Sequence, residues 1–375
     1  MDTGHPECRS RQPEEARIGG PESAVDRRRP PNPYPERALI RAFKSVSRLV
    51  ECVPNFSEGR EQKTVDAIVG AIDRESGVRV LHVDSGKAAN RMVVTFVGEA
   101  DAVERAAFYG IETASELINM RTHRGAHPRL GATDVCPFVP IGEKPIQDCI
   151  DIAERLGERV GSQLGIPVYL YAEAARAGTR QSLSVIRQGE YEGLEVKLAD
   201  PANAPDFGDP VFNAQSGATS IGARRFLIAW NVNLDTKDVS IARRIARKLR
   251  SSGERQPDGS RKPGRFRALQ GDGWYIDEFD RAQVTFNILD YHATPIARVY
   301  EACREEAAEL GVSVTGSELV GLIPGDALVD AGRFYASLKD DDSRDVIKLA
   351  VKELGLGEIH PFVPERRVIE MAYGD

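Results

Sequence analysis

The chain has 375 residues, 41% of them hydrophobic, which is enough for one large domain or two of medium size. Its formal net charge of −7 argues against a general nucleic-acid or membrane-surface binder. Five cysteines without a CxxC pair argue against a disulfide framework, and no run approaches the roughly 18 apolar residues of a membrane span. We therefore expect a cytoplasmic protein with neither a membrane segment nor a nucleic-acid partner.

The N-terminal stretch differs in composition from the rest of the chain. Residues 1–37 hold seven of the 22 prolines, and apart from Met1 their only large aliphatic side chains are Ile18 and Val25. Such a segment cannot bury enough apolar surface to offset the entropy that it loses on ordering. We expect a disordered extension over 1–48, and a second flexible segment in the polar stretch 251–264.

The part that follows this extension alternates between short apolar runs and amphipathic stripes. Val65, Ile68 and Ile72 recur with the spacing of a helix face, and two β-branched runs flank the turn-like sequence SGKAAN. In chain order the patterns predict a strand at 49–53, a helix around 65–72, strands at 78–83 and 91–97, a helix at 100–120, a strand at 133–139, a helix at 146–160 and a strand at 166–171.

The second half follows a polar connection near 195–222 and repeats this order. It is predicted to contain a strand at 225–232, a helix at 237–250, a hairpin of 267–276 and 283–290, a helix at 294–309 and a strand at 312–316. Both halves have the βαββαβ order of a ferredoxin-like unit, with helices on one face of an antiparallel sheet. We expect an α+β fold of two such subdomains, 49–222 and 223–375, packed side by side with a substrate cleft between them.

The most unusual segment is HRGAHPRLGATD, residues 123–134. His123 and His127 have the i, i+4 spacing of a helical metal site, but Gly125 and Pro128 work against a helix and no third ligand is in register, so no metal is expected. Pro128 restricts the backbone at His127, and the nearby arginines would attract carboxylates and lower the pKa of the imidazole. The segment fits an acid/base histidine for an anionic substrate, with a solvated loop as the alternative.

A second candidate is VDSGKAANR, residues 83–91. Even-numbered residues from Val78 to Asp84 alternate onto one face of the predicted strand, so Asp84 falls at the strand end. Asp84 is either a turn former or a carboxylate that orients a histidine or stabilises a developing cation. We interpret His82, in the middle of the strand, as a packed core histidine.

A third candidate is DFGDPVFNAQSGATSIGARR, residues 206–225. Its glycines permit close approach of a ligand, and Asn213 and Gln215 offer paired donors and acceptors. The stretch would suit a flat heterocycle such as a pterin, and an interdomain linker is an equally good interpretation. Further on, ten lysines and arginines lie between Arg243 and Arg267 without an RNA-recognition signature. We interpret them as a solvated helix face and loop, or as a landing surface for a polyanionic small-molecule tail.

Several long motifs, in the same order, resemble the formiminotransferase family, which includes the transferase half of formimidoyltransferase-cyclodeaminase. The likeness covers about 49–370. The motifs are LVECVPNFSEGR (49–60), VLHVDSGKAANR (80–91), HRGAHPRLGATDVCPFVP (123–140), PVYLYAEAAR (167–176), IRQGEYEGL (186–194), APDFG (204–208), GATSIGARRFLIAWNVNL (217–234), LQGDGWYIDE (269–278) and SELVGLIP (317–324).

The resemblance implies transfer of a formimino group from N-formimino-L-glutamate to N5 of tetrahydrofolate, free or polyglutamylated, in histidine degradation. It implies a homodimer, a duplicated ferredoxin-like fold with a substrate tunnel, and no metal. The family's acid/base histidine matches His127, and its helper aspartate matches Asp84. The folate-contacting stretch matches Gly208, Asp209, Pro210, Val211, Phe212, Asn213, Ala214, Gln215, Ser216 and Gly217.

Four further residues are expected to bind substrate. Arg124 and Arg129 would clamp glutamate carboxylates, because bidentate guanidinium–carboxylate pairing fixes orientation, and Asn90 and Arg91 would join them. The motifs do not separate formimino from formyl transfer, with N-formylglutamate or 5-formyltetrahydrofolate as donor. A non-catalytic folate- or RNA-binding protein is the alternative from another class. Since the chain ends near 375, we expect no cyclodeaminase domain and no release of ammonia.

Overall fold

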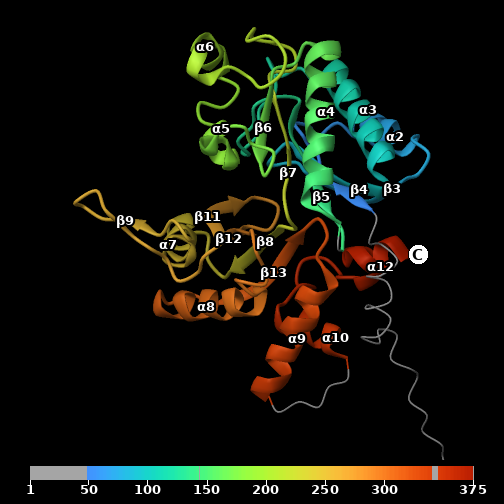
Figure 1. The fold of residues 1–375 in the computed structure, drawn as a ribbon. Helices are drawn as coiled ribbons and strands as arrows, with labels where there is room; N and C mark the ends of the chain where they lie inside the picture. Colours follow the sequence, from blue (N-terminus) through green and yellow to red (C-terminus); the bar gives the residue numbers. More distant parts are fainter. Residues whose placement is uncertain (1–48, 143, 340–344, 375) are drawn as a thin grey trace, which may run out of the picture. The chain divides into compact units, whose positions relative to one another are not determined.

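The computed structural model describes residues 49–142, 144–339 and 345–374, so the extension expected over 1–48 lies outside the described residues. The fold is mixed α+β, as the sequence predicts. The first half of the described chain is built on a seven-stranded sheet (Figure 1). Its strands are β1 (Val50–Cys52), β2 (Asn55–Phe56), β3 (Val78–Gly86), β4 (Arg91–Gly98), β5 (Thr133–Pro140), β6 (Val168–Ala172) and β7 (Thr219–Ala223).

The strand order across this sheet is β3–β4–β1/β2–β5–β7–β6. β1 and β2 both lie between β4 and β5 and are antiparallel to both, while β3 pairs antiparallel with β4. β7 and β6 extend the sheet beyond β5 in parallel. The sequence-based interpretation of 195–222 as a polar connection was therefore wrong for the last residues of that range. Thr219–Ala223 is a short, fully buried strand whose small side chains hid it in the pattern.

Helices cover both faces of this sheet. On one face lie α2 (Gln62–Asp73), α3 (Ala100–Leu117) and α4 (Ile146–Leu164), which are neighbours in Figure 1. Their apolar stripes pack on inward side chains of the strands in a core that includes Ile68, Ile111, Leu156, Phe96 and Phe138. On the other face, α5 (Leu183–Ile186) and α6 (Leu194–Ala199) pack against Tyr169 and Tyr171 of β6.

The second half contains a four-stranded antiparallel sheet in the order β11–β12–β8–β13. Its strands are β8 (Ile228–Leu234), β11 (Leu269–Ile276), β12 (Arg281–Ile288) and β13 (Val314–Val320). Their alternate apolar residues form a core with α7 (Val239–Leu249) and α8 (Ile296–Glu309). The remaining helices are α9 (Gly325–Lys339), α10 (Val346–Glu353), α11 (Pro364–Arg367) and α12 (Ile369–Gly374).

The stretch 251–264, expected to be a flexible loop, contains a small hairpin instead. β9 (Glu254–Arg255) pairs antiparallel with β10 (Arg261–Lys262). Gly253 has φ +58°, and a Cβ at this position would lie 1.9 Å from the Lys262 carbonyl oxygen. Only glycine fits this close approach, and the polar composition of the stretch concealed the pairing.

A β-bulge in β3 changes which of its residues share a face. Val80 pairs with Phe96, but His82 pairs with the adjacent Thr95. Paired residues lie on the same face of an antiparallel sheet, and neighbours along a strand alternate. His82 and Asp84 therefore lie on the face opposite Val80, so the predicted simple alternation was wrong. The bulge aims Asp84 away from the core of α2, α3 and α4.

Candidate active site

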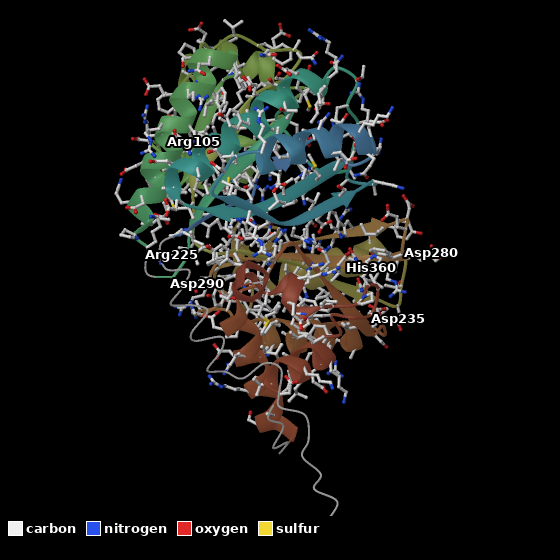
Figure 2. The ribbon with its side chains drawn as sticks, turned by 90° about the vertical axis from the view of Figure 1, so that its right-hand side faces the viewer. Arg105, Arg225, Asp235, Asp280, Asp290 and His360 are labelled. Atoms are coloured by element: carbon white, nitrogen blue, oxygen red, sulfur yellow. The ribbon has the colours of Figure 1, made fainter. Side chains whose placement is uncertain are left out.

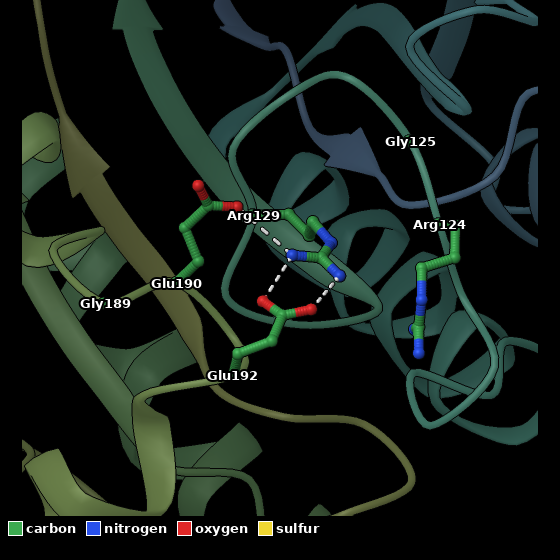
Figure 3. A pocket seen from close by; sticks show the side chains of 6 residues that line it. All are labelled: Arg124, Gly125, Arg129, Gly189, Glu190 and Glu192. Atoms are coloured by element: carbon green, nitrogen blue, oxygen red, sulfur yellow. Dashed lines mark hydrogen bonds and ion pairs between the residues drawn. The ribbon is translucent and has the colours of Figure 1, made fainter.

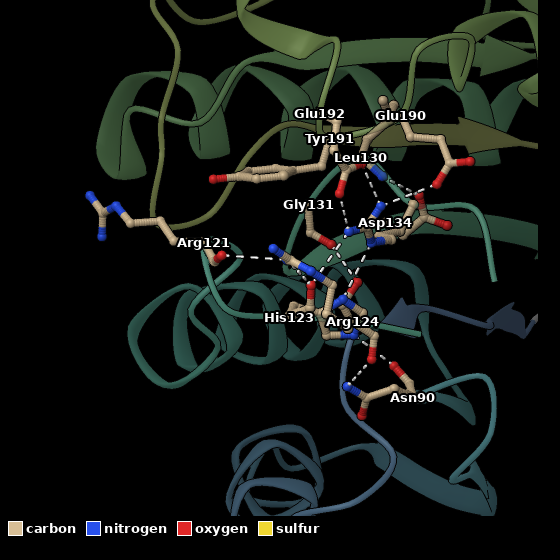
Figure 4. Close-up of polar contacts among 12 residues, drawn as sticks. Asn90, Arg121, His123, Arg124, Leu130, Gly131, Asp134, Glu190, Tyr191 and Glu192 are labelled. Atoms are coloured by element: carbon tan, nitrogen blue, oxygen red, sulfur yellow. Dashed lines mark hydrogen bonds and ion pairs between the residues drawn. The ribbon is translucent and has the colours of Figure 1, made fainter. Parts of the chain in front are cut away.

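The loop that carries His127 is fastened to the turn between β3 and β4 (Figure 4). The Asn90 carbonyl lies 2.9 Å from Nε2 of the buried His123, and Asn90 Nδ2 donates to the Arg124 carbonyl at 3.0 Å. Asn90 Oδ1 accepts from the Gly59 amide at 3.1 Å. Both polar side-chain atoms of Asn90 are thus engaged by the protein. The structure gives Asn90 a bracing position, whereas the sequence predicted substrate binding.

His127 is held half-buried in this loop. Its Nδ1 is buried without a hydrogen-bond partner among the described residues. Burial, together with the charges of Arg91 and Arg187, lowers the pKa of His127 to about 2, and the Pro128 backbone acts weakly in the opposite direction. The imidazole is therefore neutral at physiological pH.

The arginines that lower the pKa of His127 differ from those expected. The sequence pointed to arginines near the histidine in the chain, but Arg91 of β4 and Arg187 after α5 exert the effect. Arg91 is half-buried, and its NH1 donates to Asn55 Oδ1 at 2.5 Å. Arg187 forms an ion pair with Asp134, whose side chain is 1% exposed. Both guanidinium groups are therefore fixed by neighbouring strands.

Asp84 is not hydrogen-bonded to His127. It interacts electrostatically with Arg91, His82 and Arg367. Burial raises the pKa of Glu318 of β13, and repulsion by Asp84 adds to this effect. Of the two roles expected for Asp84, the geometry favours stabilising a cation over orienting the imidazole.

A pocket of about 500 Å³ opens beside this loop, lined by Arg124, Gly125, Arg129, Gly189, Glu190 and Glu192 (Figure 3). Arg129 is 7% exposed and forms ion pairs with Glu192 at 2.6 Å and Glu190 at 3.1 Å. It also donates from Nε to His123 Nδ1 at 3.3 Å. Arg124 is exposed and donates only to backbone carbonyls. Of the two predicted clamps, Arg124 is therefore the one whose guanidinium has no carboxylate partner in the described chain.

The predicted folate stretch lies against the end of α3. Gly208, Asp209, Pro210 and Val211 are exposed, the next four residues are half-buried, and Ser216 and Gly217 are buried. The Phe212 ring lies 5.4 Å from that of Tyr191. Gln215 accepts from Arg121 NH1 at 3.2 Å, and Asn213 Oδ1 accepts from the Ser216 amide at 2.9 Å. Both amides that the sequence offered to a pterin are thus engaged in shaping the loop.

Buried polar groups without partners gather on the sheet face of Asp84. One row of paired residues crosses this face, namely Asp84, Val93, Asn55, Val135, Ser220 and Tyr169. Within the described chain, the hydroxyls of Ser220 and Thr95 have no hydrogen-bond partner, like Nδ1 of His127. Buried polar atoms in native proteins are normally paired with protein, water or ligand. This face is therefore a place where water or a polar ligand is expected.

A second pocket of about 430 Å³ is lined by residues from both halves of the chain. They include Lys144, Arg225, Asp290 and Glu370, of which Arg225 and Asp290 are marked in Figure 2. His127 lines neither this pocket nor the first. The sequence gave no indication of this pocket, because its lining comes from distant segments.

Three residues of the site were missed from the sequence. Arg187 stands in a stretch of short helices that the periodicity did not predict, while Glu318 and Arg367 come from the second half of the chain. The available signals were the motif SELVGLIP, which contains Glu318, and the motif IRQGEYEGL, which contains Arg187. In the described part of the chain, no group of three or more His, Cys, Asp or Glu side chains is arranged to hold a metal ion. None of the described helices is long and apolar enough to cross a membrane.

Comparison with known proteins identifies the class. Residues 49–224 match the Formiminotransferase domain, N-terminal subdomain, and residues 229–373 match the Formiminotransferase domain. The chain is 47% identical over 336 residues to formimidoyltransferase-cyclodeaminase of Rattus norvegicus, covering 88% of this chain and 61% of the relative. It is 42% identical over 302 residues to glutamate formimidoyltransferase of Thermoplasma acidophilum, covering 80% of this chain and 96% of the relative.

The chain therefore belongs to the formiminotransferase family, and both subdomains of the family are present. A third relative, glutamate formimidoyltransferase of Streptococcus pyogenes serotype M1, is 39% identical over 297 residues, with 79% of this chain and 96% of the relative covered. The chain spans 61% of the length of the rat cyclodeaminase that it matches.

Proposed function

We propose that this protein is a glutamate formimidoyltransferase, which transfers the formimino group of N-formimino-L-glutamate to N5 of tetrahydrofolate in histidine degradation. The names of relatives aligned over 96% of their length support this activity. The observation in the structure that carries the proposal is the neutral, half-buried imidazole of His127 with its buried and unpartnered Nδ1. We further propose a homodimer and a cytoplasmic location, on the family resemblance and on the composition.

The proposal includes a ferredoxin-like core in each subdomain, with a substrate cleft between the two. In the first subdomain, strand order β3–β4–β1/β2–β5 supports it, and in the second, β11–β12–β8–β13 does so. In both sheets, the strand that comes second along the chain lies at one edge. The strand that comes first along the chain lies between the third and the fourth. The unpartnered hydroxyls of Thr95 and Ser220 support a polar cleft on this face of the first sheet.

His127 would serve as both base and acid in the transfer. N5 of tetrahydrofolate attacks the amidine carbon, which forms the N5–C bond and leaves a proton on N5. The imidazole removes that proton and delivers it to the glutamate nitrogen as the C–N bond to glutamate breaks, as microscopic reversibility requires. A neutral imidazole is the form that can begin this cycle.

Arg91 and Arg187 would couple substrate binding to the basicity of His127. Their charges help to hold its pKa at about 2, which is too low for an efficient base near neutral pH. A substrate carboxylate beside them would offset this charge and raise the pKa of the imidazole. Arg124, with no carboxylate partner among described residues, would bind a second carboxylate.

The remaining predicted site residues fall into supporting and binding roles. Arg129 would stabilise the loop that carries His127 by its contacts with His123 and Glu192. Its guanidinium is already paired with carboxylates, so it is not free to bind substrate. Asp84 would offset the positive charge of the tetrahedral intermediate. The stretch 208–217 would receive the folate, with exposed Val211 as an apolar contact.

The test measures turnover of two donors, formiminoglutamate and N-formylglutamate, with tetrahydrofolate. The release of glutamate is the quantity that is monitored. We expect turnover of formiminoglutamate and, at most, slow turnover of N-formylglutamate. Preferred turnover of N-formylglutamate would make the protein a glutamate formyltransferase on the same fold. Folate binding or salt-sensitive RNA retention without turnover of either donor would refute the enzyme.

A further inference from the structure

The second subdomain carries a sheet face that is polar and yet buried. On β8 and β12, core residues such as Trp230 and Val284 alternate with Asn231, Asn233 and Gln283, which are 4%, 0% and 0% exposed. A sheet face that packs on apolar neighbours would not have this composition, because burial of amide groups is costly without partners. The face is therefore built to hold polar groups in a fixed arrangement.

Glu318 of β13 is the charged member of this face. Gln283 Nε2 donates to Asn233 Oδ1 at 2.7 Å and lies 3.4 Å from Glu318 Oε2, while Gln283 Oε1 accepts from Trp274 Nε1 at 2.9 Å. These contacts fix the amide and with it one side of the Glu318 carboxylate. Glu318 is half-buried, and burial raises the pKa of its carboxyl group. A cation beside Glu318 would favour its ionised form.

The same carboxylate interacts electrostatically with Asp84 of the first subdomain. Arg367 interacts electrostatically with both Asp84 and Glu318, and its NH2 donates to the Leu319 carbonyl. Its Nε is buried without a partner in the described chain. A Cβ built on Gly321, just after β13, would lie 4.0 Å from the unpartnered Thr95 hydroxyl. Residues after β13 therefore approach the face on which Asp84 lies.

Neither Asp84 nor Glu318 forms an ion pair with another side chain of the described chain. Arg367 interacts electrostatically with both at longer range, Arg91 with Asp84 and His360 with Glu318. His82 adds no charge at neutral pH, because burial and Arg367 lower its pKa. A positive charge on a ligand would give the two carboxylates a direct partner. An amidine is protonated at neutral pH and presents N–H donors in a plane, which suits pairing with carboxylates, whereas a formamide is neutral.

We propose that Glu318 is a specificity-determining residue that, together with Asp84, binds the cationic formimino group of the donor and disfavours a neutral formyl group. This inference rests on the proposed function and identifies the side chain that separates its two donor classes. The discrimination arises because a buried carboxylate left without a cation is costly.

The experiment measures donor binding by calorimetry without folate, so that no transfer takes place. The proteins are the unmutated chain, Glu318→Gln, Glu318→Asp and the matched control Glu278→Gln, whose side chain is exposed on the same subdomain. We expect Glu318→Gln to weaken formiminoglutamate binding by about 10- to 100-fold, the scale of a lost charged hydrogen bond, and N-formylglutamate binding by less than about threefold. Glu318→Asp should keep the preference for formiminoglutamate, and Glu278→Gln should change neither affinity.

Equal weakening of both donors in Glu318→Gln, or no weakening of either, would overturn the inference. A melting temperature close to that of the unmutated chain establishes that each variant is folded. Turnover with tetrahydrofolate is measured separately on the unmutated protein. If the unmutated protein shows no turnover, but Glu318→Gln still weakens formiminoglutamate binding selectively, the proposed function alone is refuted. If the unmutated protein shows turnover, but Glu318→Gln does not distinguish the two donors, this inference alone is refuted.

Discussion

At the scale of single residues, the state of His127 is decided by neighbours that are remote in sequence. Arg91 comes from β4 and Arg187 follows α5, and burial adds to their effect on the pKa of the imidazole. Asp134 and Asn55 fix the two guanidinium groups in turn. The histidine is thus neutral first because the fold buries most of its imidazole, and second because it places two half-buried guanidinium groups nearby.

A titration prediction follows for His127. In the free protein its imidazole should show no protonation between pH 5 and 8, because its pKa is lowered to about 2. Saturating formiminoglutamate should move the pKa upward, since a carboxylate offsets the arginine charges. Histidine NMR signals, assigned with His127→Ala, provide the measurement. A free-protein pKa near the ordinary 6.5 would contradict the proposed environment.

The sequence predicted part of this site. The Pro128 context singled out His127, the end of a predicted strand singled out Asp84, and the family motifs matched both. Arg187 stood in the motif IRQGEYEGL without an assigned role and Arg367 stood in no quoted motif, since each becomes significant only through contacts made after folding. The predicted roles of Asn90 and Arg129 as ligands for substrate overlooked their partners, because a sequence does not reveal which polar groups already satisfy one another.

At the scale of elements, the order of strands and helices was predictable and the irregularities were not. Apolar periodicity indicated the hairpins and the helices α2, α3, α4, α7 and α8, but the sequence analysis predicted none of α9 to α12. The sequence did not reveal the bulge in β3, because VLHV, residues 80–83, has apolar residues at both odd and even positions. The sequence did not reveal β7, because a parallel strand that is buried on both faces needs no alternation of apolar and polar residues. The strand TSIGA is also short, and most of its side chains are small.

The loop that carries His127 depends on one close approach. A Cβ on Gly125 would lie 2.1 Å from the Ala89 carbonyl oxygen, so Gly125→Ala must displace the loop. We expect kcat/KM to fall about 10²-fold, since misplacement of a catalytic group by about 1 Å has effects of that size. Gly178→Ala is the matched control, because no atom lies within 4 Å of its Cβ. Equal kinetics of the two variants would show that the loop contact is dispensable.

At the scale of the whole molecule, two buried carboxyls lie in elements from opposite ends of the described chain. Glu51 belongs to β1 and Glu370 to α12, and they interact electrostatically. Burial raises the pKa of Glu51 to about 7 and that of Glu370 to about 8. Both are therefore largely protonated in the folded protein below those values. The composition gave no warning of this, because burial of an acid depends on tertiary packing.

This burial predicts a pH dependence of stability. A raised carboxyl pKa favours the folded state below the unfolded value of about 4.5, and this contribution is lost as pH rises through about 8. From pH 5.5 to 8.5, the free energy of unfolding of the unmutated protein should fall by about 3 kcal/mol more than that of Glu370→Gln. Urea unfolding at the two pH values measures it. Parallel slopes for the two proteins would rule out Glu370 as the source.

The central claim is that one imidazole moves the proton that allows a one-carbon unit to pass between two nitrogens. The most direct test compares kcat of His127→Ala with that of the unmutated protein, using formiminoglutamate and tetrahydrofolate. His292→Ala, an exposed histidine outside the site, is the control. We expect kcat of His127→Ala to fall by roughly 10² to 10⁴, with the control within about twofold of the unmutated protein. A His127→Ala enzyme that keeps kcat within a few fold of the unmutated value would contradict the account.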